Sequence, residues 1–479
     1  MTRKTDTLAA EQQSEGTETI VSRPSRRAVL AAGGAAGLAA TAGCLGLLSN
    51  DSSGTGEDGF GEPGQMTADD GTITINFWPA WGGYYEETVR SMVSEFESNH
   101  DNIEIDLNLL TNYRDSRTTA FTNIQGGDPT NMPDITHFNT ADSILARDTG
   151  WFQPIEELMN DVSPDDIIEP AAVTSTLDGT MWGAPFYVSN IVMHYNADML
   201  AEAGYDPASP PASLAEVREM GETAVEQTGA EYGVTIPNAA WFLTCWIAEQ
   251  DEYWMDQENG YAGEPTTVFS TKSHTLDIVN WWADLASNGL YFNGGIENWA
   301  DPTSVFRQAR VPFNFNSSTS IDYVNSDEFD LRTAKFPTLN GEGKGHHRGG
   351  AEIWTVNKAR SDEEREALQK FVDFALSPEQ QAAFHKASGY YPAHQGSWDV
   401  LESEGWFEDN PRYQVAREQL QEWERSGTNT GTQTGESPAI SAEVASQMNA
   451  VFGGKDPQAA MEAVKQEAEV ALARYQRQA

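Results

Sequence analysis

From Thr72 onward the chain alternates short apolar segments with amphipathic ones, and this alternation is the strongest constraint on its fold. Residues 72–78, 103–110 and 132–138 have the composition of strands, whereas 85–100 has the apolar spacing of a helix. Strands separated by helices are typical of a parallel sheet that is covered by helices on both faces. We therefore expect an α/β fold.

Several helix starts are marked by local sequence. Ser213 with Glu216 and Ser377 with Gln380 have the form of capping boxes, and Pro378 suits the first helical position. A helix is also expected from Asp456-Pro457 to about Arg477. The middle section, roughly Pro185 to Arg310, is predicted to be more helical than the rest.

The net charge limits both the partners and the source of the protein. The chain has 29 Lys and Arg against 73 Asp and Glu, a net charge of −44 spread along its length, and only 9 of its basic residues are lysine. This excess excludes a nucleic-acid-binding protein, which needs a positive surface to displace phosphate counterions. An acidic, lysine-poor composition suits molar salt, where charges are screened over about 3 Å. It predicts a halophilic source such as a haloarchaeon, in preference to an ordinary acidic extracellular protein.

The first 43 residues are predicted to be an export signal. Arg26 and Arg27 resemble a twin-arginine motif, and the small, apolar run that follows ends at a lipobox with Cys44. We expect cleavage before Cys44, a lipid anchor on its new N-terminus, and a location on the extracellular face of the cytoplasmic membrane. The alternative, an uncleaved membrane helix over 28–48, is disfavoured by its many Gly and Ala residues. Residues 44–71, rich in Gly, Ser and acids, are predicted to form a flexible tether.

No catalytic motif is present in the sequence. The phosphate-binding loop, the serine-nucleophile elbow, the zinc-protease helix and paired cysteines are all missing. Residues 341–345 have the composition of an exposed, flexible loop, and His346-His347 lacks a third metal ligand. Cys245 lies in an apolar segment and is interpreted as a core thiol. We expect neither a metal nor a cofactor, and a binding protein rather than an enzyme.

Aromatic residues on turns point to a ligand. A flat ring with a polar edge can stack on a sugar ring while amides and hydroxyls bind its OH groups. Polar partners of this kind, Asn190, Asn316, Ser317 and Thr319, lie close in sequence to aromatic segments. The aromatic residues on strand ends or turns are Trp78, Trp81, Tyr113, Trp182, Tyr187, Trp241, Trp299, Tyr390 and Tyr391.

A family resemblance covers about 72–458. The chain resembles the extracytoplasmic solute-binding proteins of carbohydrate-type ABC importers, and is most similar to their glycerol-3-phosphate-binding group. Its matching segments follow one another in the family's order. They are NFW, TNYRDSRTTAF, MPDI, PFYVSNIVMHYN, AEAGYDPASPP, FNFNSST, GGAEIWTV, FVDFALSPEQQAAFHKASGYYP and SEGWFEDNP.

The resemblance implies the two-lobed fold of class II periplasmic binding proteins, with a ligand between the lobes. One lobe is expected over 72–185 and 311–358, and the other over 186–310 and 359–479. Closure of the hinge would bury the ligand and create the surface that the membrane permease recognises. Members of this family are usually monomers.

The resemblance also implies site residues. Tyr113, Ser189, Ser317, Gly350 and Tyr390 match family ligand contacts, and Asn139-Thr140 stands where the glycerol-3-phosphate group has an acid. To these the aromatic pattern adds Trp182 and Trp241.

The phosphate-binding arginine of that group has no counterpart in Ser437–Ser441. A phosphate buried without a cationic partner would lose its charge-assisted bonds. We therefore predict a neutral sugar or polyol, with glycerol 3-phosphate as the main alternative. A glycoside hydrolase attached to the membrane is a second alternative, because it too would present tryptophan on turns.

Overall fold

The computed structural model describes residues 59–343, 345–346 and 348–477. The predicted export signal with Arg26 and Arg27, the predicted lipid anchor Cys44, Lys344 and His347 lie outside these residues.

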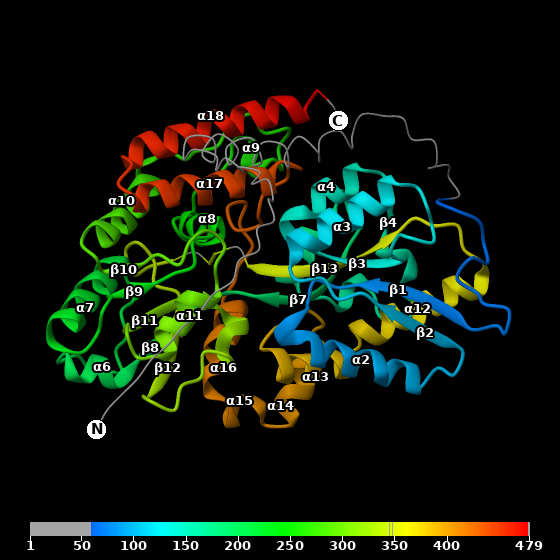
Figure 1. Cartoon of the computed structure of the whole chain (residues 1–479), viewed down its shortest axis with the longest axis horizontal. Helices are drawn as coiled ribbons and strands as arrows, with labels where there is room; N and C mark the ends of the chain where they lie inside the picture. Colours follow the sequence, from blue (N-terminus) through cyan, green and yellow to red (C-terminus); the bar gives the residue numbers. More distant parts are fainter. Residues whose placement is uncertain (1–58, 344, 347, 478–479) are drawn as a thin grey trace, which may run out of the picture. The chain divides into compact units, whose positions relative to one another are not determined.

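Seven strands form the larger of two main sheets. Six lie in the order β14-β7-β13-β3-β1-β2, and β4 pairs with β13. β1 is parallel to β2 and to β3, but β13 is antiparallel to both β3 and β7 (Figure 1). The sheet is therefore mixed, not parallel throughout as the sequence suggested, because pairing between distant strands leaves no local pattern. Its strands are β1 (Ile73–Trp78), β2 (Ile103–Leu107), β3 (Ile135–Asn139), β4 (Phe152–Gln153), β7 (Ala184–Ser189), β13 (Gly349–Val356) and β14 (Tyr391–Pro392).

Helices on this sheet build the first hydrophobic core. Ile73, Ile75 and Phe77 alternate along β1 toward this core, and the ring of Phe77 packs on Phe371 at a centroid distance of 5.3 Å. The α-helices that contribute buried residues to this core are α2 (Glu86–Ser98), α5 (Glu169–Ser175), α12 (Asp362–Leu376), α13 (Pro378–Ser388), α14 (Gly396–Ser403), α15 (Trp406–Asp409) and α16 (Pro411–Gln421). Two further helices, α3 (Tyr113–Gln125) and α4 (Ser143–Asp148), follow β2 and β3.

The second main sheet has five strands in the order β10-β9-β11-β8-β12. β8 is antiparallel to both β11 and β12, whereas β9 is parallel to β10 and β11. Its strands are β8 (Ile191–Asn196), β9 (Val234–Thr235), β10 (Tyr291–Phe292), β11 (Phe313–Ser317) and β12 (Leu331–Lys335). A separate two-stranded sheet pairs β5 (Thr176–Leu177) with β6 (Thr180–Met181).

A second hydrophobic core surrounds the five-stranded sheet. Trp246 and Trp282 are fully buried there at a ring centroid distance of 5.6 Å, and Cys245 is buried beside them, as expected of a core thiol. The last two helices, drawn in red in Figure 1, both pack against α10, and the first of them also packs against α8. The helices of this half are α6 (Ala197–Glu202), α7 (Leu214–Gln227), α8 (Ala240–Glu249), α9 (Asp256–Asn259), α10 (Ser273–Ser287), α11 (Ala300–Arg307), α17 (Ser437–Phe452) and α18 (Pro457–Tyr475).

The predicted helix starts are confirmed. Ser213 and Glu216 form a reciprocal capping box, Ser377 caps the helix that opens with Pro378, and Asp456 caps α18. The remaining short 3₁₀ helices are η1 (Gly83–Tyr85), η2 (Thr140–Asp142), η3 (Ile155–Leu158), η4 (Pro164–Asp166) and η5 (Ser318–Ile321).

Sheet membership differs from the expected lobe boundaries in two segments. Within 311–358, β11 and β12 belong to the five-stranded sheet and only β13 joins the seven-stranded one. Within 359–479, α12–α16 pack in the first core, whereas α17 and α18 pack in the second. The crossings between the two cores therefore fall at other positions than expected, between β12 and β13 and between α16 and α17.

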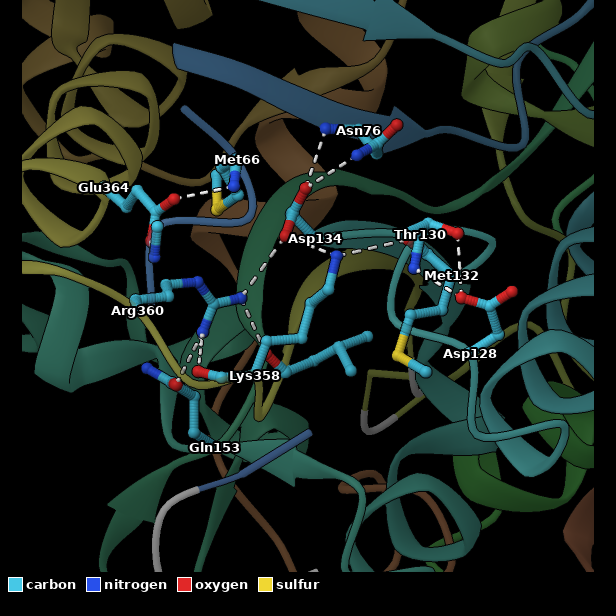
Figure 2. Close-up of polar contacts among 12 residues, drawn as sticks. Met66, Asn76, Asp128, Thr130, Met132, Asp134, Gln153, Lys358, Arg360 and Glu364 are labelled. Carbon is cyan, nitrogen blue, oxygen red and sulfur yellow. Dashed lines mark hydrogen bonds and ion pairs between the residues drawn. The ribbon is translucent and has the colours of Figure 1, made fainter. Parts of the chain in front are cut away.

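The C-terminal part of the predicted tether, 59–71, is docked on the first core. Phe60 forms a bridge with Lys358, and the Glu364 carboxylate accepts hydrogen bonds from the backbone N–H groups of Gly64 and Met66 at 2.9 and 2.6 Å. Figure 2 shows the neighbouring ion pair of Asp134 and Lys358, 2.8 Å apart. Over 59–71 the expectation of a flexible tether is therefore wrong, because backbone donors there find a buried carboxylate.

Candidate functional site

The carboxyl ends of the parallel strands bring several predicted site residues together. β1 and β3 end at Trp78 and Asn139, and the antiparallel β13 begins at the same edge, with Gly349 opposite Ser189 and Ala351 opposite Asn139. Ligands of open α/β sheets bind outside the carboxyl ends of the strands. The register thus places Asn139, Ser189 and Gly350 at the edge where a ligand is expected.

Tyr390 and Tyr113 meet at this edge. Their hydroxyl oxygens are 3.0 Å apart, and Trp81 Nε1 donates to the Tyr113 hydroxyl at 3.3 Å. The ring centroids of Trp81 and Tyr390 are 5.5 Å apart. Burial raises the pKa of both tyrosines, so the phenols stay neutral and can both donate and accept hydrogen bonds.

The turn before Tyr390 depends on glycine. Gly389 ends α13 with a φ of +73°, and a Cβ there would lie 3.0 Å from the carbonyl oxygen of Thr319. A side chain would be strained by the backbone conformation and would press on Thr319. Gly389 therefore brings the Tyr390 turn against η5, which follows the five-stranded sheet.

Ser317 and Thr319 supply hydroxyls on the other side of this contact. Thr319 Oγ1 donates to Ser317 Oγ at 3.0 Å, and Ser317 ends β11. Tyr85 also lies here, with its ring centroid 5.5 Å from that of Tyr390. Aromatic rings from the first core and hydroxyls from the second half of the molecule thus adjoin at one place.

A second group forms around the start of β13. A Cβ at Gly349 would lie 2.9 Å from Ser189 Oγ and 2.9 Å from Cζ2 of Trp241, and a Cβ at Gly350 would lie 3.5 Å from Cγ2 of Thr140. The two glycines thus allow Ser189, Thr140 and Trp241 to approach the same backbone. Trp241 lies in the first turn of α8, so this group also joins the two halves.

Some predicted residues have other roles. Asn139 caps η2, with its side-chain oxygen 2.9 Å from the N–H of Ala141. Trp182 lies before β7, whose opposite end carries Ser189, and six strand residues span about 17 Å. The structure therefore does not bring Trp182 to the other candidates. Tyr391 is fully buried and donates to the carbonyl oxygen of Tyr413 at 2.5 Å, so it packs in the core.

Buried polar atoms near the edge are left without partners. Among the described residues, the Tyr187 hydroxyl, His137 Nε2 and Trp241 Nε1 have no hydrogen-bond partner. Such atoms normally find one, because each unpaired group costs about 1–3 kcal/mol. A bound ligand or water would supply it. Desolvation lowers the pKa of His137 to about 3, so its ring is neutral at physiological pH.

Two hollows border the described surface of the seven-stranded sheet. One of about 490 Å³ borders Gly82, Glu86 and Thr111, close in sequence to Trp81 and Tyr113. The other, of about 260 Å³, borders Met66, Asn76 and Lys358. The second lies beside the ion pair in Figure 2, where β13 ends, and is therefore separate from the candidate site.

No metal centre is found in the described part of the chain, where no cluster of three or more His, Cys, Asp or Glu side chains is suited to hold an ion. His346 instead makes a 2.7 Å contact from Nδ1 to the Glu249 carboxylate. Residues 341–343 are exposed, as expected, and the chain is held at His346 immediately before β13.

Sequence reasoning missed two residues of this region. Tyr85 ends a short 3₁₀ turn, whereas the sequence placed it at the start of the helix expected over 85–100. Arg348 follows a glycine-rich segment that was interpreted as an exposed loop, yet its side chain is buried. The only available signal was its position two residues before the matched Gly350.

Comparison with known proteins adds a family and a fold. Residues 91–414 match the family described as "Bacterial extracellular solute-binding protein". The sn-glycerol-3-phosphate-binding periplasmic protein UgpB of Agrobacterium fabrum is 21% identical, over 83% of this chain and 92% of its own length. UgpB of Yersinia pseudotuberculosis is 22% identical over 84% and 93%.

Solved structures agree in fold. The GacH receptor of Streptomyces glaucescens superposes with a TM-score of 0.70 at 17% identity, over 84% of this chain and 98% of its own. UgpB of Mycobacterium tuberculosis, solved with glycerophosphocholine, gives a TM-score of 0.69 at 19% identity, over 84% and 99%. The fold is therefore the two-lobed α/β fold of periplasmic binding proteins, as expected. The family match spans well over half of the sequence, and the chain belongs to the bacterial extracellular solute-binding proteins.

Proposed function

We propose that this chain is the substrate-binding component of an ABC importer, which captures a sugar or polyol between its lobes and delivers it to the membrane permease. The observation that carries the proposal is the contact between the turn at Gly389, which carries Tyr390, and Thr319 of the other half of the molecule. Tyr390 meets Tyr113 on one side of this contact, and Thr319 bonds to Ser317 on the other. Rings provide stacking surfaces and hydroxyls provide hydrogen bonds, the combination that a polyhydroxylated ligand requires. Binding and release need no broken bond, in keeping with a binding protein rather than an enzyme.

Hinge closure is supported by the way the chain passes between the sheets. β7 ends at Ser189 in the seven-stranded sheet, and β8 begins at Ile191 in the five-stranded one. Asn190 between them exchanges hydrogen bonds with Ser318, at 3.2 and 2.8 Å. A few residues at element ends that absorb a backbone rotation are the usual form of a hinge. We assign this role to Ser189–Ile191.

The location proposed is extracytoplasmic, on a lipid anchor at Cys44 after export directed by Arg26 and Arg27. The family match supports an extracellular position. Within the described residues no helix has the length and apolarity needed to cross a bilayer. The protein is proposed to act as a monomer, from a halophilic source.

Glycerol 3-phosphate remains the main alternative ligand, because the UgpB relatives are named for binding it. An anchored glycoside hydrolase is a second alternative, and it would cleave an oligosaccharide that a binding protein returns intact.

A ligand panel tests the proposal. Tryptophan fluorescence and thermal shift, in molar salt, would be followed with sugars, polyols and glycerol phosphates. We expect saturable binding of at least one sugar or polyol, recovered unchanged by chromatography. Binding of glycerol 3-phosphate alone would replace the neutral ligand, whereas cleavage products would favour the hydrolase. No response to any compound would overturn the proposal.

A further inference from the structure

Arg348 is a buried cation that forms no hydrogen bond or ion pair within the described part of the chain. Its side chain is 5% exposed, and none of its three guanidinium nitrogens has a hydrogen-bond partner among the described residues. The buried Lys358, by contrast, forms a 2.8 Å ion pair with Asp134, and Arg360 lies 3.7 Å from the same carboxylate. Arg348 thus differs from the other buried cations near β13.

An unpaired buried guanidinium is costly to the folded state. Desolvation lowers the pKa of Arg348 to about 9, and Tyr261, Glu352 and Glu169 act on it only at longer range. The side chain is still charged at neutral pH, and it has five N–H donors and no acceptor. Proteins normally pair such a group or keep it in water. Its burial without an anion therefore requires an explanation.

One tryptophan adds a donor beside it. The ring of Trp423 lies 5.2 Å from the Arg348 guanidinium carbon. The indole Nε1 of Trp423 is buried and has no hydrogen-bond partner among the described residues. We call Arg348 and Trp423 the donor cluster. Both side chains can donate hydrogen bonds and neither can accept one.

The donor cluster adjoins the candidate site and is held in place. Arg348 immediately precedes Gly349 and Gly350, which contact Ser189 and Thr140. The backbone N–H groups of Gly345 and His346, three and two residues before Arg348, each donate to the Glu249 carboxylate at 2.9 Å. The loop that carries Arg348 is therefore fixed by a buried residue of α8.

We propose that the donor cluster receives an acidic group of the ligand, a phosphate or a carboxylate, and that Arg348 decides specificity for it. The inference rests on the proposed function, and it replaces the expected neutral ligand with an anionic sugar or polyol. The expectation of a neutral ligand depended on the missing arginine in Ser437–Ser441, whereas Arg348 comes from a different element.

Charge and hydrogen-bond chemistry favour an anion over a neutral hydroxyl. A hydroxyl brings a proton that needs an acceptor, and the donor cluster offers none. A phosphate or carboxylate accepts only, and it forms paired, charge-assisted bonds with a planar guanidinium. An anion would also neutralise the buried charge.

Matched probes test the inference. Isothermal titration in molar salt would compare glycerol 3-phosphate with glycerol, glucose 6-phosphate with glucose, and gluconate with glucose. We expect at least one anion to bind about 100-fold more tightly than its neutral counterpart. The two phosphates and the carboxylate distinguish between the possible acidic groups.

Variants assign the effect to Arg348. R348M should weaken binding of the preferred anion about 100-fold. R348K should weaken it less, because lysine keeps the charge but lacks the paired N–H donors of the planar guanidinium. The control is R332M, which removes an exposed arginine paired with Asp330 at 2.7 Å and should leave binding unchanged. R348M should also raise the melting temperature of the ligand-free protein, since it removes an unpaired buried charge.

The outcomes separate the two proposals. Equal binding of anions and neutral counterparts, or anion binding that R348M leaves intact, overturns the inference while the importer proposal stands. A lower melting temperature for ligand-free R348M also overturns it, because the guanidinium would then be structural. If no probe binds to wild-type protein that melts cooperatively, and is therefore folded, the result counts against the proposed function itself.

Discussion

Tyr390 and Tyr391 are neighbours with different roles. Tyr390 shares a hydroxyl contact with Tyr113 at the candidate site, whereas the Tyr391 hydroxyl donates to a core carbonyl. We predict that Y390A weakens ligand binding by about 1–3 kcal/mol, the range for a stacked ring. Titration calorimetry with the best ligand of the panel measures this loss.

The matched control is Y391F. It should leave ligand affinity unchanged and lower the free energy of unfolding by about 1 kcal/mol, because the carbonyl of Tyr413 loses its donor. Unchanged affinity in Y390A would remove Tyr390 from the site.

Glu352 gives a second prediction for a single residue. It is fully buried in β13, where desolvation raises its pKa to about 7 although Ser143, Ser175 and Trp354 donate to it. The folded state therefore binds this proton more tightly than the unfolded chain. Its contribution to stability is complete below pH 4.5 and is lost as pH rises through 7, by up to about 3 kcal/mol. In E352Q this dependence should vanish from denaturant titrations between pH 5 and 8. An unchanged pH profile would contradict the assignment.

At the scale of elements, Glu249 on α8 fixes the loop that leads into β13. Its carboxylate accepts from two backbone N–H groups and contacts His346 Nδ1 at 2.7 Å. We predict that E249A destabilises the protein by about 3 kcal/mol, because buried donors lose their acceptor. It should also weaken anion binding, since Arg348 would lose its position. E252A, which removes a partly exposed partner of His274, is the control for both measurements. Anion affinity unchanged in E249A would show that the loop does not need this contact.

The elements also show what local sequence can and cannot predict. Two local features could be predicted, because both depend on neighbours in the sequence. They are the helix caps at Ser213, Ser377 and Asp456 and the alternation of buried and partly exposed residues along β1. The antiparallel pairing of β13 with β3 and β7 could not be predicted, since it joins residues far apart in sequence. Arg348 was missed for the same reason: its burial depends on α8 and on Trp423. Motif order indicated Tyr113, Ser317 and Tyr390, whereas composition alone added Trp182, which lies elsewhere.

At the scale of the whole molecule, the net charge of −44 predicts a dependence on salt. Even if every one of the 29 basic residues neutralised an acid, 44 acidic charges would remain to repel one another. Repulsion is felt over about 10 Å in 0.1 M salt but only about 3 Å in 1 M salt. We expect the melting temperature to rise by at least about 5 °C between 0.1 and 2 M KCl. Sucrose at equal osmolality is the control. It stabilises folded proteins because it is excluded from their surface, but it does not screen charge, so a smaller effect of sucrose would assign the effect of KCl to screening. Neutralising Glu104, Glu408 and Glu467, which are exposed and form no ion pair within the described residues, by glutamine should reduce the dependence on salt. A melting temperature that does not change with KCl would mean that the acidic surface is not an adaptation to high salt. That result would contradict the inference of a halophilic source.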